Sequence, residues 1–102
     1  MFDVKVITNA IHEALFYEMT SFRSNGFTYE IICWKPNPIE IRNSRRICRI
    51  YRLNPAEKER NRITYLEINA DNTSKVIWND CLSEEDKKTF TDAFKNNDIL
   101  IA

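Results

Sequence analysis

Glycine and histidine are nearly missing from this chain of 102 residues, which contains one residue of each type. One glycine, Gly26, is too few for the glycine-rich loops that bind nucleotide phosphates or for the turns that hold serine nucleophiles. One histidine, His12, and scattered cysteines do not provide the four ligands of a zinc site. The sequence therefore predicts no catalytic residues, no metal and no cofactor, and it indicates a protein that is not an enzyme.

Cysteine pairs with the spacing of a disulfide framework are also missing. Cys33, Cys48 and Cys81 are odd in number and widely spaced, so we expect reduced thiols in a cytoplasmic protein. Each lies in or beside a predicted strand, where buried and inert thiols are usual. The first residues lack the pattern of a secretory signal, and no apolar run is long enough to span a membrane.

Apolar residues are plentiful enough for a hydrophobic core. Hydrophobic residues make up 43% of the chain and aromatic residues 12%. A chain of this length corresponds to one domain, which we expect to span residues 1–102. Because glycine is so rare, turns that need a positive φ are expected to use asparagine or aspartate.

Helical periodicity is present near both ends of the chain. Apolar residues recur at helical spacing over residues 3–22, where Asp3 is placed to cap the first turn and Gly26 to end the segment. In the second helix, predicted to run to residue 96, Ser83 is the cap and is followed by three acidic residues. The apolar tail 99–101 is expected to pack against the domain.

Alternating residues rich in aromatic and β-branched types predict the strands between these helices. They cover residues 27–34, 46–53, 62–69 and 75–80. In the first of them, Tyr29, Ile31 and Cys33 share one face with Phe27.

The connections between the strands differ in character. Prolines end the first strand, and residues 39–41 are expected to form a short extended piece. Residues 54–60 resemble a helix start of one or two turns, and residues 70–74 form a turn. The predicted fold is α+β: an antiparallel meander of three to four strands flanked by an N-terminal and a C-terminal helix (α-β-β-β-β-α) in two layers.

Charge is segregated along the chain although the net charge is zero. Residues 42–62 hold eight basic side chains against two acidic ones, while residues 63–102 hold four against eight. We therefore expect a dipolar molecule with two candidate partner-binding poles. The basic pole consists of Arg45, Arg46, Arg49 and Arg52, and the acidic pole consists of Glu84, Glu85 and Asp86.

The arginines of the second strand do not form one row. On a strand, Arg46 and Arg52 lie on one face with Cys48 and Ile50. If this face covers a core, the charged ends of the two arginines can extend past its edges to solvent. Arg49 lies on the other face, where pairing with Glu67 or Glu30 across strands is one possibility. Whether these arginines are paired internally or contact a partner stays open. The acidic first turn of the second helix also has two interpretations: ordinary helix capping, or a patch of carboxylates that mimics phosphates and contacts a partner.

Three functions remain open. The first is a non-enzymatic protein-binding domain, such as an immunity protein, an inhibitor or a host-factor modulator from a phage or mobile element, guided to its partner by charge. The second is an RNA- or single-stranded DNA-binding domain that combines the arginines with outward aromatic residues. The third is a small nuclease-type toxin that uses His12 and arginines. Self-association through an edge strand is compatible with each. For the second function, the aromatic residues that could stack on nucleic-acid bases are Trp34, Tyr51, Tyr65 and Trp78.

Overall fold

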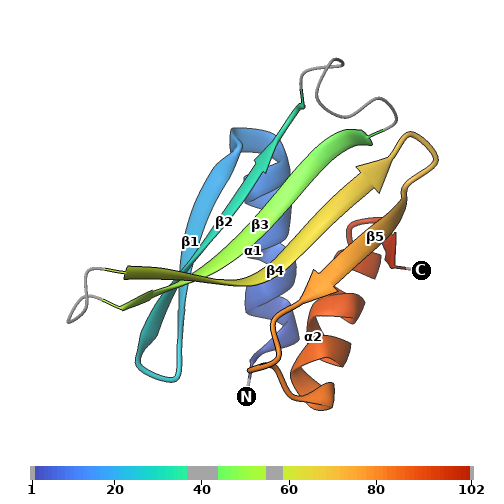
Figure 1. The fold of residues 1–102 in the computed structure, drawn as a ribbon. Coiled ribbons are helices and arrows are strands. Elements are labelled where there is room, and N and C mark those ends of the chain that lie inside the picture. The colour runs from blue at the N-terminus through green and yellow to red at the C-terminus, as the bar shows by residue number, and fades with distance from the viewer. Residues whose placement is uncertain (1, 37–43, 55–58, 102) are drawn as a thin grey trace.

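A six-stranded sheet with both helices on one of its faces forms the structure, a computed structural model that describes residues 2–36, 44–54 and 59–101 (Figure 1). Strands β1 to β5 are antiparallel neighbours in chain order, and β6 adds to β5 in parallel. The elements are α1 (Val4–Tyr17), β1 (Met19–Ser24), β2 (Phe27–Trp34), β3 (Ser44–Asn54), β4 (Glu59–Asn69), β5 (Thr73–Trp78), α2 (Glu84–Lys95) and β6 (Leu100–Ile101). The predicted α+β class is confirmed, whereas a mixed six-stranded sheet replaces the predicted meander of three to four strands.

The first helix is shorter than predicted, because residues 19–24 form β1. Glu18 ends α1 in the left-handed region at φ 73°, and its carbonyl oxygen accepts a hydrogen bond from the Cys33 N–H. The chain then turns back at Asn25 and Gly26, both at positive φ, as a two-residue hairpin loop requires. Gly26 therefore ends a strand rather than a helix, and pairing with β2 overrides the helical spacing of Phe22.

The other predicted elements have mixed outcomes. The strand 27–34 and the helix capped by Ser83 are confirmed, and the three later strands differ only in their bounds. The predicted helical turn does not extend to Arg60, because β4 begins at Glu59; residues 55–58 and the predicted piece 39–41 lie outside the described residues. Positive φ falls on Asn25, Asn72 and Asp98 as expected, and additionally on Glu18.

The core lies between the sheet and the two helices. Tyr29, Ile31 and Cys33 of β2, which the alternation placed on one face, are buried and face the buried side chains of α1 and α2. Phe2 adds its ring to this layer, with its centroid 4.9 Å from that of Phe90. The apolar tail docks as expected, because Ile99 is fully buried and residues 100–101 pair with β5.

The cysteines contradict the prediction of three reduced and buried thiols. Cys33 and Cys48 are opposite each other on β2 and β3, where they form a disulfide within the core. Cys81 is free and exposed. Spacing along the chain did not indicate the bond, because β-sheet register brings together residues that are 15 positions apart. Among the described helices, none is both long and apolar enough to cross a membrane.

Candidate functional site: an arginine-aromatic sheet face

The side of the sheet that faces away from α1 and α2 carries the most distinctive surface of the described residues. We call this side the open face (Figure 1). Strand register assigns its side chains, since directly paired residues point to the same side of an antiparallel sheet. They are Met19, Ser21, Arg23, Thr28, Glu30, Ile32, Trp34, Ile47, Arg49, Tyr51, Leu53, Arg60, Arg62, Tyr65, Glu67, Lys75 and Ile77.

Arg49 occupies the middle of the open face, on the central strand β3. Its guanidinium carbon lies 5.0 Å from the ring centroid of Trp34 on β2 and 5.6 Å from that of Tyr65 on β4. The pairing of Arg49 with Glu67 or Glu30, one possibility that the sequence left open, is not observed among the described residues, because these carboxylates have other partners. Glu67 accepts a hydrogen bond from the Tyr65 hydroxyl (3.0 Å), and Glu30 pairs with Arg60 (2.9 Å).

Two further arginines repeat this arrangement on β4. The guanidinium carbon of Arg60 lies 4.6 Å from the ring centroid of Tyr51, and that of Arg62 lies 5.2 Å from the ring centroid of Tyr65. Ile50 pairs with Thr64 and Tyr51 pairs with Arg62, so β4 has one extra residue, Ile63, which forms a bulge. Ile63 and Thr64 therefore both point inward, while Arg62 points outward. Each cation–π contact contributes about 0.5–1 kcal/mol at an exposed site, and together they hold the guanidinium groups in place.

The charge of the molecule is divided between the two faces of the sheet. The open face carries five cations, Arg23, Arg49, Arg60, Arg62 and Lys75, against Glu30 and Glu67. On the other side of the sheet, the two helices with their capping residues carry seven carboxylates and four lysines, and Arg46 and Arg52 of β3 add two cations to that side. The Arg60–Glu30 pair is the one ion pair on this face among the described residues. By this count the excess of positive charge lies on the open face, and the helix side is nearly balanced.

Two side chains make part of the open face rigid. Ile47 is 3% exposed although it points away from the main core, with Trp34 and Glu67 as its cross-strand neighbours. Burial, followed by the hydrogen bond to Glu67, raises the pKa of Tyr65 above its usual range. Tyr65 consequently remains a neutral hydrogen-bond donor at physiological pH, and it keeps Glu67 in a defined position.

The four arginines chosen from the sequence separate in the structure. Arg49 is on the open face, whereas Arg46 and Arg52 point to the helix side at the two ends of the Cys48–Ile50 segment, as the alternation predicted. Arg52 stacks on Phe27 at 5.0 Å, and Arg45 donates from Nε to Asn72 in the β4–β5 turn. The basic pole is therefore not one surface.

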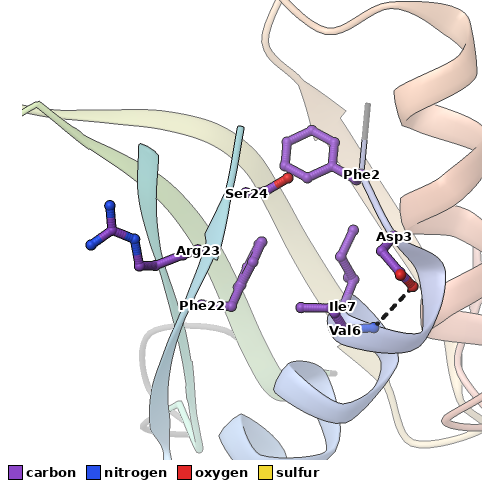
Figure 2. A pocket seen from close by; sticks show the side chains of 7 residues that line it. All are labelled: Phe2, Asp3, Val6, Ile7, Phe22, Arg23 and Ser24. Atoms are coloured by element: carbon purple, nitrogen blue, oxygen red, sulfur yellow. Dashed lines mark hydrogen bonds between the residues drawn. The ribbon is translucent and has the colours of Figure 1, made fainter. Parts of the chain in front are cut away.

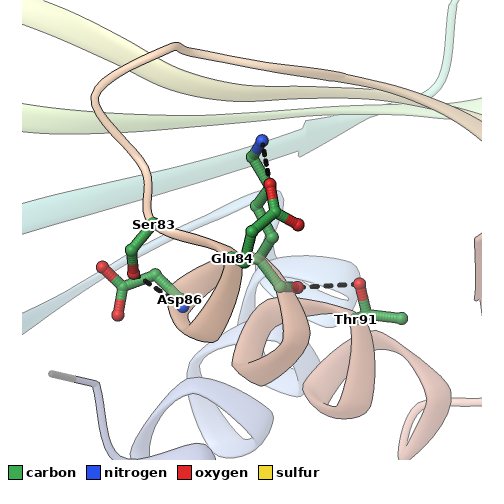
Figure 3. A network of polar contacts seen from close by, with 5 residues as sticks. Ser83, Glu84, Asp86 and Thr91 are labelled. Atoms are coloured by element: carbon green, nitrogen blue, oxygen red, sulfur yellow. Dashed lines mark hydrogen bonds and ion pairs between the residues drawn. The ribbon is translucent and has the colours of Figure 1, made fainter.

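The acidic pole lies in the first turn of α2, on the opposite side of the sheet from Arg49. Ser83 caps this turn by accepting a hydrogen bond from the Asp86 N–H (3.1 Å), and Glu84 pairs with Lys87 (Figure 3). Glu85 is exposed. These contacts are those of a capped helix start, and one flat partner cannot contact both this turn and Arg49.

Sequence reasoning did not select Arg60 or Arg62, because their place on the open face depends on the bulge in β4. It did name Trp34, Tyr51 and Tyr65 as outward aromatic residues, and the register places all three on the open face. Trp78, named with them, instead packs against the core on the helix side.

Side chains for catalysis or metal binding do not gather elsewhere on the described residues. His12 is exposed on α1 beside an open hollow of about 370 Å³ that is also lined by Glu13, Phe16 and Tyr17. No group of three metal-ligating side chains occurs in the described parts of the chain. Comparison with known protein families, with curated proteins and with solved structures gives no match in any of the three.

Proposed function

We propose that this chain is a non-enzymatic protein-binding domain that captures an acidic surface of another protein with its open face. The observation that carries the proposal is that Arg49 and Arg62 lie over aromatic rings and form no ion pair among the described residues. Beside them, Arg60 stacks on Tyr51 and pairs with Glu30. Arginine, tyrosine and tryptophan are enriched where protein interfaces concentrate their binding energy. Inhibitors, immunity proteins and modulators of host factors are the classes of protein that work by such capture alone.

The arrangement of rings on the open face favours a protein over a single-stranded nucleic acid. Bases stack on open ring faces, yet guanidinium groups lie over the rings of Trp34, Tyr51 and Tyr65. Glu30 and Glu67 add negative charge within the same surface, which opposes a phosphate backbone. A partner with alternating carboxylates and apolar groups matches the cations as well as exposed apolar residues such as Ile77, which is 58% exposed.

Charge reversal on one face at a time tests the proposal. The open-face variant combines Arg62→Glu with Lys75→Glu, and the control combines Lys88→Glu with Lys95→Glu on α2. Both variants change the net charge equally. With the tagged chain as bait in a nuclease-treated lysate of its native host, the wild type and the control are expected to capture the same partner. The open-face variant is expected to bind the purified partner about tenfold more weakly or worse.

Two results would overturn this proposal. Equal affinity of the open-face variant and the control for the captured partner would show that the open face is not the contact surface. Tight binding of oligo(dT) or oligo(rU) at low salt, lost in the open-face variant and kept in the control, would assign the same surface to nucleic acid.

A further inference from the structure

The two edges of the sheet are unequal. At one edge, β6 is only two residues long, whereas β1 at the other edge has six residues. Proteins usually protect a long edge strand with proline, lysine or a bulge. β1 has the sequence MTSFRS without proline or lysine, its one charged side chain is Arg23 near its end, and its register with β2 is uninterrupted. This edge is therefore a template for another strand.

The outer edge of β1 presents an ordered row of free hydrogen-bonding groups. The Cys33 N–H donates to the Glu18 carbonyl, so the even-numbered residues of β1 bond to β2 in the alternating antiparallel pattern. The N–H and C=O groups of Met19, Ser21 and Arg23 then point outward, and no partner for them exists among the described residues. Met19 is 57% exposed, and Ser21 and Arg23 are exposed as well.

We propose that β1 pairs in antiparallel orientation with β1 of a second copy of this chain, across a two-fold axis at Ser21. In this register Ser21 faces its own counterpart, and Met19 of each copy faces Arg23 of the other. The three outward-pointing residues of one strand then exchange all their N–H and C=O groups with the same three residues of its mate. The two serine side chains fit side by side at the axis, because serine is small.

Charge complementarity selects the antiparallel self-pairing. Glu18 immediately precedes β1 and Arg23 lies near its end, so the strand is acidic at one end and basic at the other. The two-fold brings Glu18 of each copy opposite Ser24 of the other, next to its Arg23. A parallel arrangement would instead place like charges together, which costs free energy. The strand is thus complementary to itself, as a two-fold interface requires.

The helix behind β1 supports the same arrangement. Val6, Glu13 and Tyr17 are seven and four residues apart, so they lie on one face of α1, and that face follows β1. Glu13 accepts a hydrogen bond from the Thr20 hydroxyl (2.8 Å). At the other end, Val6 and Phe22 line a cavity of about 30 Å³ between α1 and β1, while Arg23 points away from the helix (Figure 2).

Exposed apolar groups at both ends of this helix face gain a partner in the pair. Val6 is 42% exposed, Phe16 75% and Tyr17 71%. The two-fold sets the α1 helices of the two copies antiparallel, so the C-terminal aromatic pair of one approaches the N-terminal valine of the other. Each α1 packs over β1 and β2, and strands lie about 4.8 Å apart, which puts the helix axes about 10 Å apart. That separation is the usual packing distance of helices.

Cross-linking tests the register directly. With Cys81→Ser as background, Ser21→Cys is expected to give a disulfide-linked dimer on mild oxidation. Residues that form a hydrogen-bonded pair have Cα atoms about 5.5 Å apart, within disulfide reach. Met19→Cys in the same background is the control, since the two Met19 positions would be about 14 Å apart. Equal cross-linking of both variants, or none with Ser21→Cys, would overturn the proposal.

The mass of the whole chain in solution provides an independent readout. Sedimentation is expected to give a dimer for the wild type and a monomer for Ser21→Pro, which removes an outward N–H and leaves the bonds to β2 intact. Leu100→Lys at the opposite edge is expected to remain dimeric. A monomeric wild type, or a dimeric Ser21→Pro variant with the wild-type fold, contradicts the pairing. The open-face variant with Arg62→Glu and Lys75→Glu should stay dimeric, so failure of the dimer and failure of the proposed function are distinguishable.

Discussion

Reduction of the Cys33–Cys48 disulfide is predicted to remove about 3 kcal/mol from the free energy of unfolding. The bond closes a loop between cysteines that are 15 residues apart, and a cross-link of that length restricts the unfolded chain by about this amount. With a denaturant slope of about 1.5 kcal/mol per molar urea, the unfolding midpoint falls by about 2 M on reduction. Urea unfolding followed by tryptophan fluorescence, with and without a phosphine reductant, measures the difference without changing any side chain.

Thiol counting gives the matching control and the refuting result. In denaturant, the unreduced chain is expected to react with one equivalent of thiol reagent, at Cys81, and the Cys81→Ser variant with none. The bond is fully buried, so the reductant is expected to act on it only as the chain unfolds. Three reactive thiols per chain before reduction, or coincident unfolding curves with and without reductant, would refute the reasoning.

Three smaller perturbations complete the set. Glu18→Gly places glycine at the left-handed position that ends α1 and is expected to stabilise the fold by up to about 1 kcal/mol, because glycine adopts positive φ without strain. The melting temperature should rise, and a lower melting temperature would contradict this prediction. Ser83→Ala removes the cap of α2 and is expected to cost about 1 kcal/mol in urea unfolding; no change would mean that the cap is redundant. Burial raises the pKa of Tyr29 and of Tyr65, so the stability that they confer is complete below the unfolded pKa of about 10 and is lost as the pH rises towards the raised values. Urea midpoints between pH 8 and about 11.5 should therefore fall less steeply for Tyr65→Phe than for the wild type, and equal slopes contradict this.

Local chemistry was sufficient for several elements. The alternation from Phe27 to Trp34 predicted a strand, its bounds and which of its residues share a face, since strand periodicity separates the two sides of a sheet without knowledge of its neighbours. Ser83 with the acids after it predicted the start of α2 for an equally local reason. The scarcity of glycine also predicted that asparagine and aspartate would adopt positive φ in turns, as Asn25, Asn72 and Asp98 do.

The candidate site was only partly predictable. The positions of Arg46, Arg49 and Arg52 on opposite faces of β3 followed from alternation. The partners of these arginines could not be predicted. The register of three strands decides whether a guanidinium group lies against an aromatic ring or a carboxylate. Arg60 and Arg62 joined the site only through a bulge in β4, which a single strand pattern does not reveal.

The sequence by itself determined the α+β class, the two faces of β2 and the capped second helix, because each depends on interactions within about one turn or one strand. Only the tertiary structure decided that α1 ends at Tyr17, that Cys33 meets Cys48, and that an excess of positive charge lies on the open face. All three depend on pairing between distant segments. Hydrogen bonds to β2 outweigh the weak helical preference of residues 19–24, and register alone determines which side chains share a face.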